Sequence, residues 1–220
     1  MIGTEIASDS SDLVLVTGAS GYVAGHCILK LLDDGYRVHG SLRSLKRAGE
    51  VRNWLIKARG DADPGDALSF VEAELTDANG WHAAMDGVRY VLHVASPIPS
   101  KMPKDPDDLI VPAREGTLNV MRAAAAASVE RVVQTSSSAA IMYGCDDPNS
   151  HVFTEEDWTD PDHKDNIPYT RSKPLPNVRP GTNCRNWRAL WSGSPSILVL
   201  SSAPYWIRTP VLRFRLSPNF

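Results

Sequence analysis

The sequence predicts an α/β protein built on a doubly wound parallel sheet. Short apolar runs alternate with segments of helical periodicity from residue 13 to residue 135. Such runs, bounded by polar loops, are typical of buried parallel strands. The first run ends in a glycine-rich turn that opens a helix. Because crossover connections between parallel strands are right-handed, five strands in this pattern predict the order 3-2-1-4-5.

The first strand and helix enclose the most specific local pattern of the chain. Residues 13–17 form an apolar run too short for a helix, and residues 22–34 carry apolar side chains at helical spacing. Between them, Gly18, Gly21 and Ala24 stand at G-x-x-G-x-x-A spacing. In dinucleotide-binding proteins such residues allow the tight turn, the approach of a pyrophosphate and close helix–strand packing. The alternative is an ordinary strand–turn–helix whose glycines serve geometry alone.

The remaining elements follow along the chain in the same alternation. The apolar runs predict four further strands, at residues 36–42, 67–73, 88–95 and 131–135. The helical periodicity predicts three further helices, at residues 45–59, 77–85 with Asp77 as cap, and 107–127. Residues 138–167 are expected to be mostly loop.

The composition is typical of a soluble globular domain. Hydrophobic residues make up 42% of the chain and charged residues 22%, and no apolar run approaches the length of a membrane span. Residues 1–11 are polar, so we expect a disordered N-terminus and not a signal peptide. The residues Cys27, Cys145 and Cys184 lack C-x-x-C spacing, and the six histidines are scattered. This predicts a cytoplasmic protein with reduced cysteines and no metal.

The composition changes after Lys173. Residues 174–220 hold six arginines and seven prolines but no lysine or acidic residue, and within them only residues 197–200 fit a strand. We therefore expect a dinucleotide-binding domain at residues 12–173 and an unrelated, mostly irregular tail, of the kind that a shifted reading frame produces. The spacing of its arginines matches no nucleic-acid-binding fold, so no nucleic-acid partner is expected.

The end of the second expected strand bears on the choice of dinucleotide. NAD-binding proteins place Asp or Glu here against the ribose hydroxyls, whereas this chain has Gly40-Ser-Leu-Arg-Ser44. Arg43, with Lys46 or Arg47 nearby, suits the 2′-phosphate of NADP. We therefore expect NADP as the cofactor and NAD as the less favoured one. The alternative is a solvated basic surface patch.

Hydroxyl groups and a Tyr–Lys pair follow the fifth expected strand. Thr135-Ser-Ser-Ser138 closes the strand, and Tyr169 and Lys173 stand four residues apart. On a helix, residues i and i+4 share a face, so the ammonium would favour the phenolate and make the phenol a better proton donor. Taken alone, such a hydroxyl cluster usually forms a turn, and the Y-x-x-x-K spacing is common by chance.

Together these motifs resemble the extended short-chain dehydrogenase/reductases, or NAD-dependent epimerase/dehydratase family, and most of all its dihydroflavonol reductase and cinnamoyl-CoA reductase branch. The resemblance covers residues 12–173. It rests on five stretches: Thr17-Gly-Ala-Ser-Gly-Tyr-Val-Ala24, Leu92-His-Val-Ala-Ser-Pro97, Glu115-Gly-Thr-Leu-Asn119, Val132-Val-Gln-Thr-Ser-Ser137 and Pro168-Tyr-Thr-Arg-Ser-Lys173.

The resemblance implies a Rossmann fold and a role for each matching residue. Ser137 would polarise a substrate carbonyl, Tyr169 would give it a proton, and Lys173 would hold the nicotinamide ribose and tune Tyr169. The cofactor-binding residues that it implies are Gly18, Ser20, Gly21 and Tyr22 at the pyrophosphate, Arg43 at the 2′-phosphate, Glu74 and Leu75 at the adenine, and Ala95, Ser96 and Lys173 at the nicotinamide. His93 is expected to be a packed strand residue and not a proton carrier.

The function implied is an NADP-dependent carbonyl reductase or alcohol dehydrogenase acting on a small aldehyde, ketone or alcohol. In the family the Tyr–Lys helix continues into a substrate domain, but here Pro174 follows Lys173 and disfavours the helix. We therefore expect a truncated domain with impaired activity and some self-association. The alternatives are a nucleotide-sugar epimerase or dehydratase, against which Arg43 argues, and a non-catalytic dinucleotide-binding remnant.

Overall fold

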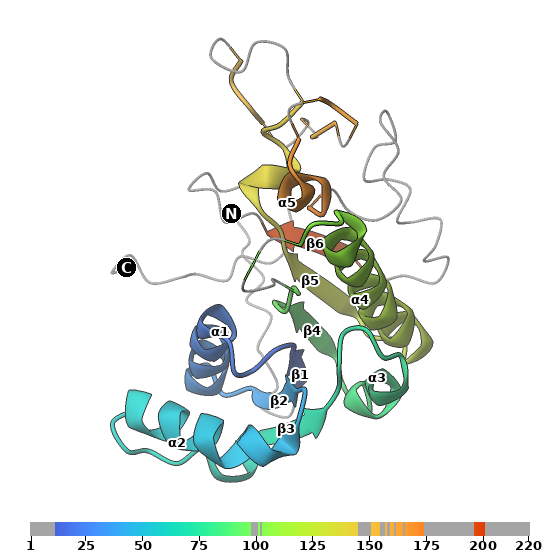
Figure 1. The fold of residues 1–220 in the computed structure, drawn as a ribbon. Coiled ribbons are helices and arrows are strands. Elements are labelled where there is room, and N and C mark those ends of the chain that lie inside the picture. The colour runs from blue at the N-terminus through green and yellow to red at the C-terminus, as the bar shows by residue number, and fades with distance from the viewer. Residues whose placement is uncertain are drawn as a thin grey trace, which may run out of the picture.

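The structure is a computed structural model that describes residues 12–97, 101, 103–144, 151–154, 157, 159–160, 162–164 and 166–173, and the backbone of residues 196–200. Figure 1 shows a parallel sheet with helices on both sides. One face carries α1 (Tyr22–Asp33) and α2 (Ala48–Ala58), and the other carries α3 (Asn79–Ala84) and α4 (Asp107–Ala126). This is the doubly wound α/β architecture that the sequence predicts.

The sheet has the order β3-β2-β1-β4-β5-β6, and every neighbouring pair is parallel. Its strands are β1 (Leu13–Val16), β2 (Arg37–Leu42), β3 (Leu68–Glu72), β4 (Tyr90–His93), β5 (Arg131–Thr135) and β6 (Ser196–Leu200). The predicted order of the first five strands is confirmed. β6 adds a sixth strand beside β5, at the part of the tail that fits a strand. The other residues after 173, the N-terminal residues 1–11, Cys145 and Cys184 lie outside the described residues.

Most predicted boundaries are confirmed to within two residues, and the departures have local causes. The helix expected at residues 45–59 begins as a short 3-10 turn, η1 (Leu45–Arg47), before α2. The strand expected at residues 88–95 is shorter at both ends. Val88 donates its N–H to the carbonyl of Met85 in a turn, and Val94 and Ala95 donate theirs to the Thr17 hydroxyl. Another 3-10 turn, η2 (Gly65–Ala67), precedes β3.

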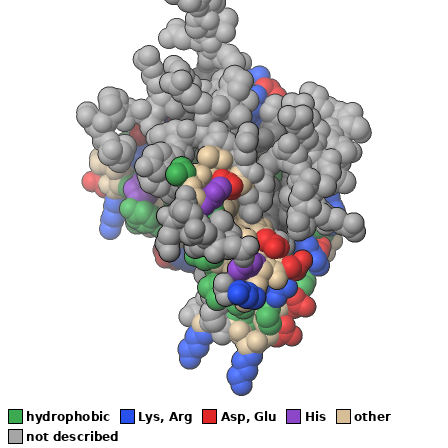
Figure 2. Space-filling model, turned by 90° about the horizontal axis from the view of Figure 1, so that it is seen from above, with side chains coloured by type: hydrophobic (Ala, Val, Ile, Leu, Met, Phe, Trp, Pro, Cys, Tyr) green, Lys and Arg blue, Asp and Glu red, His purple; other side chains and the backbone are tan. Residues whose placement is uncertain are grey.

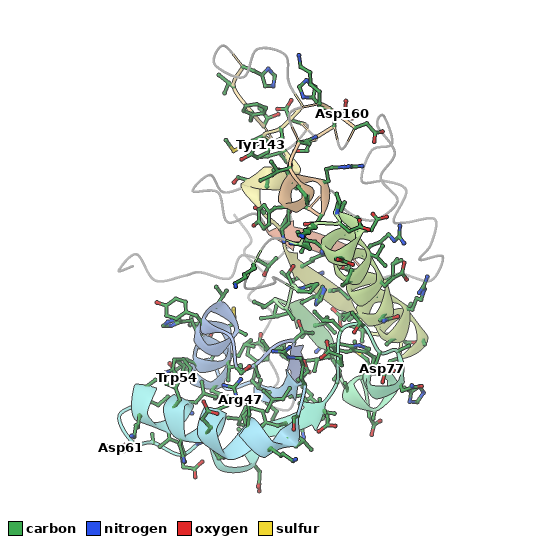
Figure 3. The ribbon with its side chains drawn as sticks, in the orientation of Figure 1. Arg47, Trp54, Asp61, Asp77, Tyr143 and Asp160 are labelled. Carbon is green, nitrogen blue, oxygen red and sulfur yellow. The ribbon has the colours of Figure 1, made fainter. Side chains whose placement is uncertain are left out.

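Two apolar cores lie on opposite faces of the sheet because alternate strand residues point in opposite directions. Val14 and Val16 pack with α1 and α2, whereas Leu15 packs with α3 and α4. The first core brings its two helices very close together. A Cβ added to Gly25 in α1 would stand 2.5 Å from the ring of Trp54 in α2, and Figure 3 shows Trp54 between these helices.

Candidate functional site

The glycine-rich turn joins β1 to α1 in a conformation that requires glycine. Gly18 has a φ of +69°, and a Cβ on it would stand 2.9 Å from the Cβ of Ala95. Its N–H donates to the Ser41 hydroxyl at 3.0 Å, and the Gly21 N–H donates to the Gly18 carbonyl at 2.8 Å. The turn is therefore hydrogen-bonded to β2 and lies close to the residues that follow β4.

The first turn of α1 is open to an anion. Gly21 is the N-cap residue, no side chain caps the helix, and the first turn holds no acidic residue. The first N–H groups of a helix have no partner within it and carry partial positive charge. Around a Cβ built on Gly21, the Gly18 carbonyl oxygen is the one atom of the described residues within 4 Å, apart from the neighbours of Gly21 in the chain. These features fit the pyrophosphate of a dinucleotide.

The two other residues expected at the pyrophosphate are exposed. Ser20 lies on the surface of the turn. The side chain of Tyr22 is 77% exposed, and its ring packs edge-on against His26 at 4.6 Å between ring centroids. Because His26 is one turn further along α1, the Tyr22 ring leans along the helix while its backbone N–H stays in the first turn. The geometry therefore favours its backbone and not its ring as the phosphate contact.

Thr17 fastens the ends of β1 and β4 together, and the sequence reasoning missed this role. Its hydroxyl oxygen accepts the N–H groups of Val94 and Ala95 at 3.0 and 2.9 Å and lies 3.0 Å from Nδ1 of His93. Since the oxygen already accepts two hydrogen bonds, its own proton is directed at Nδ1, which accepts it. His93 is buried, and burial lowers its pKa to about 4, so the ring is neutral. It is a core residue, as expected.

The corner after β2 carries the charged groups expected at the adenosine end of the cofactor. Arg43 is exposed, and its Nε lies 3.9 Å from a carboxylate oxygen of Glu74. The other oxygen of that carboxylate accepts the N–H of Leu75 at 2.9 Å. The Leu75 carbonyl in turn accepts the side-chain amide of Asn119 on α4 at 2.9 Å. The structure thus brings Arg43, Glu74 and Leu75 together, and it adds an ion pair that the sequence does not reveal.

The Tyr–Lys pair lies at the end of a single helical turn, α5 (Pro168–Arg171). Lys173 follows the helix, and its Nζ stands 4.7 Å from the centre of the Tyr169 ring and donates to the Ser96 hydroxyl at 3.2 Å. Burial lowers the pKa of Lys173. Although α5 ends before Pro174, the two side chains meet as the i and i+4 spacing predicts, and Ser96 joins them from the end of β4.

Ser137 precedes a short 3-10 turn, η3 (Ser138–Ala140), which contacts α5. Its hydroxyl oxygen accepts the N–H of Ala139 at 3.2 Å. This bond fixes the oxygen and leaves the hydroxyl proton to donate elsewhere. Ser137 follows the carboxyl end of β5, which lies on the same side of the parallel sheet as the carboxyl ends of β1 and β4.

Comparison with known proteins identifies the family. The model described as "NAD dependent epimerase/dehydratase family" matches residues 14–175. The chain belongs to this family. A putative anthocyanidin reductase from Ginkgo biloba is 39% identical over 149 residues, which are 67% of this chain and 42% of that protein. Cinnamoyl-CoA reductase 1 from Petunia hybrida is 37% identical over 158 residues, 70% of this chain and 44% of its own length.

Solved structures of family reductases have the same fold. Yeast methylglyoxal/isovaleraldehyde reductase Gre2, solved in complex with NADPH, is 26% identical with a TM-score of 0.65 over 86% of this chain and 56% of its own. Vestitone reductase from alfalfa is 26% identical with a TM-score of 0.58, over 74% of this chain and 49% of its own. The chain spans less than half the length of the curated relatives named above. The resemblance to this reductase branch that the motifs indicate is confirmed.

Within the segment expected to be mostly loop, Thr159 forms a hydrogen-bonded brace with η3 and the residues that follow it. Thr159 is buried; its hydroxyl donates to the Ala139 carbonyl at 2.8 Å and accepts the Tyr143 N–H at 3.1 Å. Its N–H donates to the Ala140 carbonyl at 2.9 Å. Figure 3 shows the neighbouring Asp160 and Tyr143 side by side above α5. No local sequence pattern marks such a brace, because its partners are 16 and 20 residues away.

The face seen from above the sheet mixes both signs of charge. Figure 2 shows Asp and Glu side chains next to Lys and Arg side chains, some of which project at its lower edge.

Within the described ranges, no three His, Cys, Asp or Glu side chains gather where they could hold a metal ion. None of the helices in the described part of the chain combines the length and apolar character that crossing a membrane requires. Burial raises the pKa of the Cys27 thiol.

Proposed function

We propose that residues 12–173 form the cofactor-binding and catalytic part of an NADP-dependent reductase that converts small aldehydes or ketones to alcohols. The observation that carries the proposal is a continuous set of contacts along one edge of the sheet. Gly18 lies so near Ala95 that a Cβ on it would stand 2.9 Å from the Ala95 Cβ. The next residue, Ser96, accepts a hydrogen bond from Lys173, and Lys173 lies over the Tyr169 ring. These contacts support the proposal because the turn suited to phosphate and the proposed proton donor lie at the carboxyl ends of the strands, where open α/β sheets bind ligands.

The choice of NADP rests on Arg43. It is a cation at the position where an NAD-binding protein holds an acid, and its side chain is 82% exposed, so a 2′-phosphate can approach it from solvent. The relative named in complex with NADPH agrees with this choice. Arg43 also argues against a nucleotide-sugar epimerase, which keeps NAD bound and carries an acid there.

Each side chain of the site has a separate role in the proposed reaction. Bound NADPH would supply the hydride to the carbonyl carbon. The Ser137 hydroxyl donates a hydrogen bond to the carbonyl oxygen, and the Tyr169 phenol gives that oxygen its proton as the negative charge develops. The Lys173 ammonium stabilises the phenolate that remains. Hydride and proton together turn the carbonyl into an alcohol.

The test is a comparison of cofactor affinities by isothermal titration calorimetry. The chain should bind NADPH more tightly than NADH. Arg43→Ala should reduce the difference between the two affinities by weakening the binding of NADPH alone. Arg122→Ala, which removes an exposed arginine from α4, serves as the matched control and should change neither affinity. Equal affinities for both cofactors, unaltered by Arg43→Ala, would remove the NADP assignment.

A further inference from the structure

The carboxylate of Glu74 occupies a fixed place beside Arg43. The chain before Glu74 is tied to β2, since the Ala73 N–H donates to the Leu42 carbonyl at 2.9 Å. The carbonyl of Glu74 accepts the indole N–H of Trp81 at 3.0 Å, and its carboxylate accepts the Leu75 N–H. Of the carboxylates in the described part of the chain, Glu74 is the one that pairs with Arg43. The carboxylate is thus held by a backbone N–H, whereas the Arg43 side chain is 82% exposed.

The whole corner around Arg43 is balanced in charge. Arg47 is held by Glu50 through two hydrogen bonds of 3.0 and 3.1 Å. A carboxylate oxygen of Glu72 accepts the Leu45 N–H at 3.0 Å. The corner therefore contains three cations and three carboxylates, namely Arg43, Lys46, Arg47, Glu50, Glu72 and Glu74. Among the described residues of this corner, an incoming phosphate therefore meets no excess of positive charge.

We propose that Glu74 is a specificity-determining residue that lowers the chain's preference for NADPH over NADH by acting as the counter-ion of Arg43. This rests on the proposed use of Arg43 for the 2′-phosphate. A phosphate monoester carries about −1.5 to −2 charges at pH 7. To reach Arg43 it must displace the carboxylate and then remain beside it, whereas the ribose hydroxyl of NADH carries no charge and meets no such repulsion. The carboxylate therefore weakens the binding of NADPH more than the binding of NADH.

The experiment removes the charge of Glu74 and keeps its shape. Dissociation constants for NADPH and NADH are measured calorimetrically for the wild-type chain, Glu74→Gln, Arg43→Ala and the double variant, which together form a double-mutant cycle. Glu74→Gln should tighten NADPH binding about two- to fivefold, the range expected for an exposed ion pair, and change NADH binding less. The tighter NADPH binding caused by Glu74→Gln should disappear when Arg43 is also replaced by Ala. It should become smaller at about 1 M salt, where the Debye length is about 3 Å.

Two controls separate this effect from others. Glu130→Gln removes a carboxylate that pairs with Arg89 at 2.7 Å just before β5, at the opposite edge of the sheet, and should leave both affinities unchanged. The same dissociation constants are measured for adenosine 2′,5′-bisphosphate and adenosine 5′-monophosphate, which differ in the 2′-phosphate and lack the nicotinamide half. Glu74→Gln should tighten only the bisphosphate.

The outcomes are distinct. If Glu74→Gln weakens or tightens both cofactors equally, the carboxylate acts on the shared adenosine and the inference is overturned. No change for either cofactor, beside a wild-type preference for NADPH that depends on Arg43, also overturns it and leaves the proposed function standing. A wild-type chain without any preference, and without response to Arg43→Ala, removes the NADP proposal itself.

Discussion

Lys173 lies with its Nζ 4.7 Å from the centre of the Tyr169 ring and donates a hydrogen bond to Ser96. Among the described residues no carboxylate forms an ion pair with this ammonium, and burial lowers its pKa. A half-buried cation with a hydroxyl as its partner stabilises negative charge nearby more strongly than a solvated one. In the proposed reaction, that negative charge is the phenolate that Tyr169 would leave after giving its proton to the substrate.

Tyr169→Phe tests that role. It should lower the turnover of NADPH-dependent carbonyl reduction by about 10²-fold or more, because the proton donor is lost, while the dissociation constant of NADPH stays within about twofold. Steady-state NADPH oxidation against a panel of aldehydes and ketones measures the first quantity, and calorimetry the second. Tyr143→Phe, at an exposed tyrosine of the neighbouring loop, is the control. Equal turnover in the two variants would show that the proton comes from elsewhere.

Gly18→Ala tests the turn. The φ of +69° costs a non-glycine residue about 1–2 kcal/mol, and the new Cβ would stand 2.9 Å from Ala95. The variant should lose stability to urea and NADPH affinity together. Gly60 offers a matched control, since its φ is +68° but a Cβ there meets nothing within 4 Å. Gly60→Ala should lower the free energy of unfolding only by the cost of the positive φ, because its Cβ meets no neighbour. Equal losses in both variants would contradict the close approach of Gly18 to Ala95.

His93 should make the stability fall in mild acid. Its pKa is about 4 in the folded chain and about 6.5 in the unfolded chain, so the unfolded state binds more protons between these values. Its contribution is complete above pH 6.5 and is lost as the pH falls toward 4, by up to about 3 kcal/mol. Urea unfolding at several pH values should show a shallower decline for His93→Asn than for the exposed control His82→Asn. Identical declines would count against a neutral, buried His93.

Thr159→Val should loosen the brace between η3 and the chain that leads to α5. The change keeps the side-chain size but removes a donor to the Ala139 carbonyl and an acceptor for the Tyr143 N–H. Leaving buried polar groups unpaired costs about 1–3 kcal/mol each, and urea unfolding should show a loss of that order. Thr159→Ser should recover most of it. Thr76→Val, at an exposed position, should change little; a similar small effect for Thr159→Val would show that the brace is dispensable.

The sequence predicts the sheet well because its signals are local. Apolar runs with polar ends mark each strand, the right-handed crossover rule supplies the order, and Gly18 and Gly21 mark the turn. The end of β4 is the exception, since the N–H groups of Val94 and Ala95 leave the ladder for Thr17. A hydroxyl 77 and 78 residues away gives no local pattern.

The site is predictable to the extent that it lies at strand ends. Tyr169 and Lys173 meet because four residues separate them, and Ser96 joins them because β4 and β5 end on the same edge. The Arg43–Glu74 pair depends on the β2–β3 register, in which Leu42 lies beside Glu72, and on the direction of two exposed side chains. Periodicity carries neither piece of information.

The contact between Gly25 and Trp54 has a consequence beyond helix packing. α1 begins at the glycine turn, and α2 continues through η1 from the corner that holds Arg43. The two helices therefore begin next to the proposed pyrophosphate and 2′-phosphate positions, which the hydrogen bond from Gly18 to Ser41 already ties together. With no side chain at Gly25, the Trp54 ring fills the space between the helices, and any larger residue at position 25 would force the ring, or α2 with it, away from α1.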